Sequence, residues 1–318
     1  MNPGPLQLHL EAYLALESAL GLPLRAREKQ LRHFVAFVEA SGLVGPIPAQ
    51  LALDWACATS DRCGISGQAA RLSLVRRFLL HLSSVVPGTE VPSPALVARP
   101  RRRIPFLFSA GEISDLLQVA SALGPPASLR PHTISTILGL LASSGLRSSE
   151  ALQLTVTDVW LDRDPPQLEI RQSKFHKSRR VPIHETTAHK LRAYADQRCR
   201  LHYDGLSDYF FVSERGGRMR YMALYNTFQK LVSGLGIVAK GGSRKPSLHS
   251  LRHGFAVDRL RTWYQQGADV RAKLPELSVY LGHLEPAHTY WYLSATPELL
   301  GEAARLFSDY AKVGGSHE

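Results

Sequence analysis

One stretch of the sequence divides the chain more clearly than any other. Residues 85–105, VVPGTEVPSPALVARPRRRIP, contain five prolines and no sustained apolar periodicity. Proline lacks the backbone N–H that helices and sheets use, so such a stretch interrupts regular structure. A chain of 318 residues is also long for a single core. We therefore expect one domain at residues 1–85, a basic Pro-rich linker at residues 86–105 and a larger domain at residues 106–318.

The part of the chain before the linker is predicted to be helical. Apolar residues recur every three or four positions between Leu8 and Leu82, as in LRHFVAFVEA and RLSLVRRFLLHL. This is the pattern of helices with one buried face. Breaks at Pro23, Gly42 and Gly64 divide the region into about four helices.

The larger part combines helices with a few strands. In SAGEISDLLQVA, Ser109 stands at a plausible N-cap with Glu112 three residues later, the capping-box pattern. Another helix is expected over residues 131–143. Between residues 156 and 183 the pieces DVWLD, QLEIRQ and RRVPI are separated by turns. The predicted fold class is mainly α with a small antiparallel β-sheet.

The charge balance favours a polyanionic partner. The formal net charge is +11, and residues 101–318 carry 29 basic and 20 acidic side chains. Nucleic acid is the commonest partner of such a surface. The three cysteines form no CxxC pair, so no metal or cofactor is expected. No apolar run approaches the roughly 20 residues that span a bilayer, and the start of the chain lacks a signal peptide, so we expect no membrane partner and a cytoplasmic, nucleoid-associated protein.

Four short segments carry side chains suited to phosphodiester chemistry. Within GLRSSEAL, QSKFHKSRRVPI, HSLRHGFA and LGHLEPAHTYWYL these are Arg147, Glu150, Lys174, His249, Arg252, His283, Tyr290 and Tyr292. An arginine fork can donate two hydrogen bonds to non-bridging phosphate oxygens. A tyrosine phenol beside cations is a credible nucleophile, and a lysine can protonate a leaving 5′ oxygen. Together these groups could bind a phosphodiester and cleave it.

In combination the four segments resemble those of the tyrosine recombinases, also called the phage integrase family, and HTYWYLSATPELL resembles the mobile-element branch. The resemblance covers most of the chain. It implies a helical core-binding, DNA-binding domain followed by an α+β catalytic domain with a C-terminal helical tail. The implied function is a site-specific DNA recombinase or integrase, or a transposase of a mobile element, that cleaves and rejoins DNA through a 3′-phosphotyrosyl intermediate. The alternative is a catalytically silent DNA-binding protein of the same fold.

Matched to the family's motifs, the catalytic residues are Arg147, Lys174, His249, Arg252, His283 and Tyr292, with Glu150 supporting Arg147. Tyr292 is the implied nucleophile because it follows His283 by nine residues, as the family's tyrosine does. Residues two apart on a helix point about 200° away from each other, so Tyr290 cannot face the same phosphate. Family hairpins usually flank the lysine with glycines, whereas Ser173 and Phe175 stand here, and Lys177 remains an alternative proton donor.

The expected DNA contacts lie in the linker, the hairpin and the loop before HSLRH. They are Arg99, Arg101, Arg102, Arg103, Lys177, Arg179, Arg244 and Lys245. His253 is likewise expected to be solvated or to contact phosphate. The partner is double-stranded DNA, and the resemblance implies self-association to a tetramer on two DNA sites. A need for other recombinases or accessory proteins is left open. The tail after Thr296 either docks on a neighbouring protomer or caps its own domain.

Overall fold

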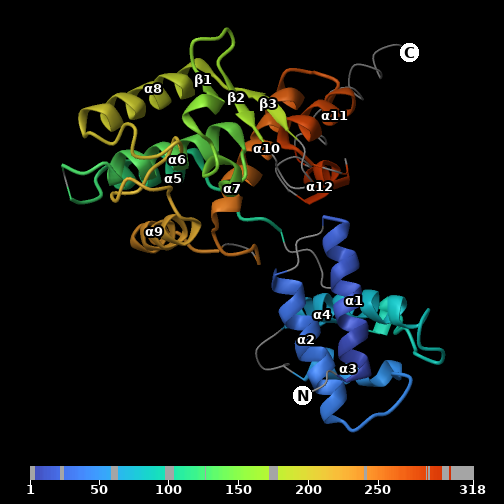
Figure 1. Cartoon of the computed structure of the whole chain (residues 1–318). Coiled ribbons are helices and arrows are strands. Elements are labelled where there is room, and N and C mark those ends of the chain that lie inside the picture. The colour runs from blue at the N-terminus through green and yellow to red at the C-terminus, as the bar shows by residue number, and fades with distance from the viewer. Residues whose placement is uncertain are drawn as a thin grey trace, which may run out of the picture. The chain divides into compact units, whose positions relative to one another are not determined.

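The computed structural model divides into two compact units, Met1–Arg102 and Arg103–Glu318 (Figure 1). The structure describes residues 4–21, 25–58, 64–96, 104–125, 127–171, 178–239, 242–283, 285, 287–295 and 301. Each unit has its own hydrophobic core. No helix among these residues combines the length and the apolar character that a membrane crossing requires.

The first unit is built from the four helices that the sequence predicts. They are α1 (Pro5–Ala19), α2 (Arg25–Ala40), α3 (Ala49–Cys57) and α4 (Ile65–Leu82). Their apolar stripes meet in one core in which Phe34, Trp55 and Phe78 are almost fully buried. The buried carboxylate of Glu17 on α1 is paired with Arg77 on α4 at 3.2 Å. A buried carboxylate needs such a partner because ionisation away from water is costly.

The start of the expected linker packs on this first unit. The backbone N–H of Glu90 donates to Ile47 O at 2.9 Å, and Arg76 Nε donates to Pro92 O at 3.0 Å. A short 3₁₀ helix, η1 (Pro94–Leu96), contacts α4. Residues 86–96 therefore belong to the helical unit, because hydrogen bonds compensate for the regular structure that their prolines exclude.

The second unit contains the expected mixture of helices and strands. Its elements are α5 (Ala110–Ser121), α6 (Arg130–Ser144), α7 (Ser148–Ala151), η2 (Val156–Asp158), β1 (Val159–Trp160), β2 (Gln167–Ile170), β3 (Arg179–Pro182), α8 (Glu185–Arg200), α9 (Tyr221–Gly234), α10 (Leu248–Gln265), α11 (Val270–Leu281) and α12 (Ala287–Ala295). The fold class predicted from the sequence is confirmed. The capping box at the start of α5 is also present, with Glu112 N donating to Ser109 Oγ and Ser109 N donating to Glu112 Oε2.

The sheet and helix α6 hold the parts of the second unit together. The strands run antiparallel in the order β1-β2-β3, with Leu168 opposite both Val159 and Val181. Alternation places Val181 inside and its neighbours Arg180 and Pro182 outside. Helix α6 packs against α5, α8 and α10. Figure 1 shows the sheet beside α10 and α11.

Candidate active site

The site is organised around the C-terminal end of α11. Gly282 follows this helix with φ of 69°, the left-handed conformation that glycine adopts most easily. Its N–H donates to Val279 O at 2.9 Å, and the N–H of His283 donates to Ser278 O at 2.9 Å. These two bonds form a Schellman motif, which leaves the last carbonyl groups of the helix directed outward.

Three consecutive carbonyl groups at this helix end each accept a hydrogen bond from a different arginine. The pairs are Arg179 Nε to Tyr280 O (2.8 Å), Arg252 Nη2 to Leu281 O (2.7 Å) and Arg147 Nη2 to Gly282 O (2.7 Å). A helix C-terminus carries partial negative charge, so it favours cations. The arrangement gathers three guanidinium groups whose mutual repulsion would otherwise separate them.

Glu150 joins two of these arginines. Its side chain is 4% exposed, and its oxygens accept from Arg147 Nη1 at 2.7 Å and from Arg179 Nη1 and Nη2 at 3.0 Å each. Burial alone would raise the pKa of Glu150, but the hydrogen bonds and charges of Arg179 and Arg147 outweigh it and lower the pKa. Arg147 makes a second hydrogen bond to Glu150, from its backbone N to Oε2 at 2.9 Å, which fixes the start of α7.

Arg252 lies deepest in the site. It is 1% exposed, and its Nη1 donates to Gly145 O at 2.8 Å. Burial and the charge of Arg147 lower its pKa to about 10, so the side chain still carries a full charge at neutral pH. The two backbone bonds of Arg252 use two of five N–H donors, which leaves donors for an anionic oxygen.

Close approach of the backbone explains the glycines beside these arginines. At Gly145, with φ of 61°, an added Cβ would lie 2.5 Å from Phe255 Cδ1. At Gly282 it would lie 2.7 Å from Arg179 Nη1. Both positions need glycine for conformation and for space.

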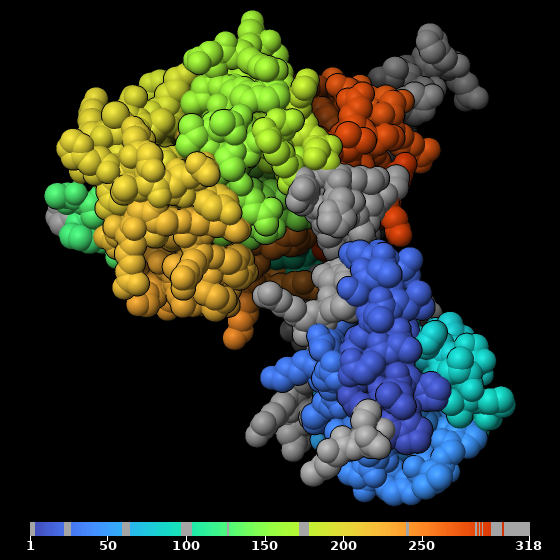
Figure 2. Space-filling view, viewed as in Figure 1, coloured from blue at the N-terminus to red at the C-terminus, as the bar shows by residue number. Residues whose placement is uncertain are grey.

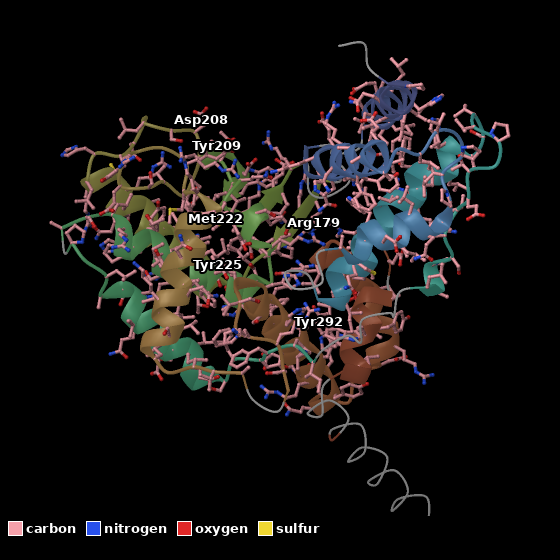
Figure 3. All side chains as sticks on the ribbon, turned by 90° about the horizontal axis from the view of Figure 1, so that it is seen from below. Arg179, Asp208, Tyr209, Met222, Tyr225 and Tyr292 are labelled. Atoms are coloured by element: carbon pink, nitrogen blue, oxygen red, sulfur yellow. The ribbon has the colours of Figure 1, made fainter. Side chains whose placement is uncertain are left out.

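The two tyrosines of α12 lie in different environments. Tyr292 is 2% exposed, whereas Tyr290 is 46% exposed. The hydroxyl of Tyr292 is hydrogen-bonded to His253 Nδ1 at 2.8 Å. The Tyr292 ring lies 6.5 Å, centroid to centroid, from that of His283. The charge of Tyr292 raises the pKa of Arg252, against the larger effects of burial and of Arg147, and Figure 3 shows Tyr292 and Arg179 arriving from different elements.

Two histidines, His253 and His283, lie against Tyr292, and the third, His249, packs on His253. His283 Nδ1 is hydrogen-bonded to Thr289 Oγ1 at 2.7 Å, which connects the α11 turn to α12. His249 and His253 lie one turn apart on α10 with their rings edge to face at 4.4 Å. Crowding by protein atoms and the charges of Arg252, Arg147 and Arg244 lower the pKa of His249, although this residue is exposed.

The described part of the chain thus brings together Arg147, Glu150, His249, Arg252, His283 and Tyr292. Six of the residues expected in the site or in contact with DNA lie outside the described residues. They are Lys174, Lys177, Arg99, Arg101, Arg102 and Arg103. Arg244 and Lys245 are exposed. Within the described residues no group of His, Cys, Asp and Glu could hold a metal ion.

Two residues differ from their expected roles. Arg179 is expected to contact DNA, but its side chain is 11% exposed and its guanidinium group is bonded to Glu150 and Tyr280 O. Strand alternation signals this, since Arg179 shares the face of buried Val181. His253 is expected to be solvated or to contact phosphate, but it contacts Tyr292. The sequence could have indicated this, because His253 follows His249 by four residues and so lies on the same face of one helix.

Comparison with known proteins shows which family this chain is similar to. The model of the phage integrase family matches residues 108–298. The protein y4rB of Sinorhizobium fredii, described as a candidate integrase/recombinase, is 40% identical over 304 residues, covering 93% of this chain and 95% of the relative. The tyrosine recombinase XerD of Mycobacterium tuberculosis (strain CDC 1551 / Oshkosh) is 31% identical over 251 residues, covering 76% of this chain and 75% of the relative.

Solved structures show the same fold at lower identity. The Tn1549 transposon integrase, solved in complex with transposon right end DNA, superimposes with a TM-score of 0.67 at 13% identity. The match covers 95% of this chain and 99% of that one. The family match over more than half of the chain and the two relatives above 30% identity lead to one conclusion: the chain belongs to the phage integrase family of tyrosine recombinases.

Proposed function

We propose that Tyr292 is the nucleophile of a strand-breaking and strand-joining reaction on DNA and that the residues around it form its active site. As a tyrosine recombinase, the chain is a site-specific recombinase that cleaves and rejoins DNA. The observation that carries the residue assignment is the buried phenol of Tyr292, hydrogen-bonded to the imidazole of His253, the residue that directly follows Arg252. Neighbouring cations favour the phenolate form that attacks phosphorus.

In the cleavage step Tyr292 Oη forms a bond to the scissile phosphorus while the bond from phosphorus to the 5′ oxygen breaks. Arg147 and Arg252 donate hydrogen bonds to the non-bridging oxygens, which gain charge in the transition state. His249 and His283 complete the donors around the phosphate. Lys174 protonates the leaving 5′ oxygen, with Lys177 as the alternative donor. The product is a 3′-phosphotyrosyl enzyme, and the reverse step joins the strand to a new 5′ hydroxyl.

DNA reaches this site along exposed basic parts of the catalytic unit. Arg244 and Lys245 precede α10. Before α9, a hollow of about 760 Å³ is lined by several basic side chains, Arg215, Arg218 and Arg220. Figure 2 shows α8 and α9, in yellow and gold, on an exposed face of this unit. Such side chains suit phosphate contacts that fix the register of the duplex, and the linker arginines extend the set.

Recombination between two duplexes determines how many protomers act together. Four strands are cut and rejoined, and each cleavage uses one tyrosine, so four protomers act on two DNA sites. The tail after Thr296 serves as a contact between protomers or as a cap on its own unit. A substrate of this kind places the protein in the cytoplasm at the nucleoid. The similarity to a transposon integrase and the segment HTYWYLSAT favour a mobile element as the source of the DNA.

The test is to trap the covalent intermediate. Nicked, labelled duplexes from the DNA that flanks the gene are incubated with wild type, Tyr292→Phe and Tyr290→Phe, and protein–DNA adducts that resist SDS are mapped to a peptide. Adduct formation by wild type and Tyr290→Phe, but not by Tyr292→Phe, is the expected result. Loss only with Tyr290→Phe would move the nucleophile by two residues. DNA binding without an adduct on any duplex would favour the alternative, a catalytically silent DNA-binding protein.

A further inference from the structure

The second histidine of the segment HSLRH contacts the reacting atom itself. His253 Nδ1 lies 2.8 Å from Tyr292 Oη, within the usual range for an O–H···N hydrogen bond. The contact joins α10 to α12 across 39 positions of sequence. By contrast, the ring of His249 packs edge to face on the ring of His253, which fixes the orientation of the inner imidazole.

We infer that His253 is a further catalytic residue, which accepts the phenolic hydrogen of Tyr292 on Nδ1, fixes the position of Oη and takes up the proton as the bond to phosphorus forms. The inference rests on the proposed function, because it assigns the proton of the same nucleophile. The balance of the step is complete. The O–H bond of Tyr292 breaks and its proton moves to Nδ1, the Oη–P bond forms, the P–O5′ bond breaks, and Lys174 supplies the proton of the 5′ hydroxyl. Rejoining returns the proton from His253 to the phenol.

The surroundings of His253 keep its ring in the form that can accept a proton. The charged and titratable groups that face it are His249, Arg252, Arg244, His283 and Tyr292. Burial and the first four of these groups lower the pKa of His253 to about 3, so the imidazole is neutral at neutral pH. A neutral imidazole with hydrogen on Nε2 has a free lone pair on Nδ1.

Bound DNA should raise the pKa of His253, which makes the imidazole a better proton acceptor for the reaction. A phosphate held by Arg147 and Arg252 brings negative charge beside His253 and offsets the positive charges that disfavour the imidazolium. The base therefore becomes stronger only when the substrate is in place. In the DNA-free protein the same hydrogen bond holds Oη within the buried site.

The test compares single-turnover cleavage on a nicked duplex on which wild type forms an adduct. His253→Ala is expected to slow cleavage by about 100-fold or more, the usual contribution of a general base, with little change in DNA affinity or melting temperature. His253→Asn should cleave faster than His253→Ala but slower than wild type, because its amide oxygen can accept the hydrogen bond but takes up a proton poorly. His189→Ala, at an exposed histidine of α8, is the matched control and should cleave as wild type does.

A second substrate separates the two proton transfers. A duplex with a 5′-bridging sulfur at the scissile phosphate has a leaving group that needs no proton. Lys174→Ala should recover on it, whereas His253→Ala should remain slow. Recovery of His253→Ala on the sulfur substrate, cleavage by His253→Ala at or above the wild-type rate, or full activity of His253→Asn would each overturn the inference.

A measurement without DNA keeps this inference separate from the proposed function. In ¹⁵N-histidine-labelled protein, His253 Nδ1 should lack hydrogen, and its resonance should shift in Tyr292→Phe but not in Tyr290→Phe. Hydrogen on Nδ1, or no shift in Tyr292→Phe, would overturn the assignment. If wild type formed no adduct on any duplex, that outcome would count against the proposed reaction, while the NMR result would still decide whether His253 accepts from Tyr292.

Discussion

Arg147 and Arg252 donate hydrogen bonds to adjacent carbonyl groups, those of Gly282 and Leu281, at 2.7 Å each. The two guanidinium groups come from segments 105 positions apart in the sequence, and one helix end sets the distance between them. In the proposed reaction these two fixed cations use their remaining donors to bind the oxygens of one phosphate. The geometry is present without DNA, so little reorganisation is required when the substrate binds.

Replacement of Arg147 should affect the reaction more than binding. In Arg147→Ala, loss of a donor to the transition state should slow cleavage by about 100-fold or more, whereas DNA affinity should fall much less because many other phosphate contacts remain. Single-turnover cleavage and a binding titration on the same duplex check this. Normal cleavage combined with poor binding would exclude the assigned role.

Gly282 should tolerate no side chain. In Gly282→Ala the new Cβ meets Arg179 Nη1 at 2.7 Å in addition to the strain of a left-handed backbone, which by itself costs about 1–2 kcal/mol. Gly267 has almost the same φ, 67°, with nothing within 4 Å of its Cβ position. Gly267→Ala therefore measures the strain alone. Thermal unfolding of both variants should show the larger loss for Gly282→Ala, and equal losses would show that Arg179 simply moves aside.

Glu150 should make the stability of the catalytic unit depend on acid pH. Its pKa is lowered in the folded protein by Arg179 and Arg147, against the effect of burial. Its contribution is therefore fully present above the unfolded-state pKa, near 4.5, and is lost as the pH falls through the folded-state pKa. Glu150→Gln should lower the free energy of unfolding by about 3 kcal/mol at neutral pH, because the arginines lose a buried partner. Urea unfolding of both proteins should show the difference shrinking below pH 4.5; a difference that does not change with pH would argue against an ionised Glu150.

The sequence predicted the helices, the small sheet and the motif residues because each depends on local periodicity or short spacing. Helix α5 starts at its capping box, and the α12 tyrosines separate as the helix geometry requires, Tyr290 outside and Tyr292 inside. The sequence could not show that the carbonyl groups of Tyr280, Leu281 and Gly282 hold the three arginines. Every residue has a backbone carbonyl group, so residue types do not reveal which of them accept these bonds. The partner of His253 lies 39 positions away, a distance that only tertiary packing determines.

Binding of DNA should weaken steeply with salt. Each phosphate contact releases counterions, so the logarithm of the binding constant falls linearly with the logarithm of the salt concentration. Replacing both exposed residues Arg244 and Lys245 by Gln should reduce the slope by about two, roughly one for each contact. Titrations at several salt concentrations measure this. An unchanged slope would place the duplex away from the loop before α10.

Arg179 and Arg180 are neighbours on β3 that should behave differently when each is changed to Met. Arg179 is paired with buried Glu150, whereas Arg180 is exposed and its guanidinium lies 5.1 Å from the Trp160 ring centroid. Arg179→Met leaves a buried carboxylate with one partner fewer, which should cost about 3–5 kcal/mol. Cleavage should also fall, because Glu150, which accepts from Arg147, is then held less firmly. Arg180→Met should change stability by no more than about 0.5 kcal/mol. If Arg179 were a DNA contact instead, Arg179→Met would leave unfolding unchanged and reduce the salt dependence of binding, so the two assignments give opposite results in the same pair of measurements.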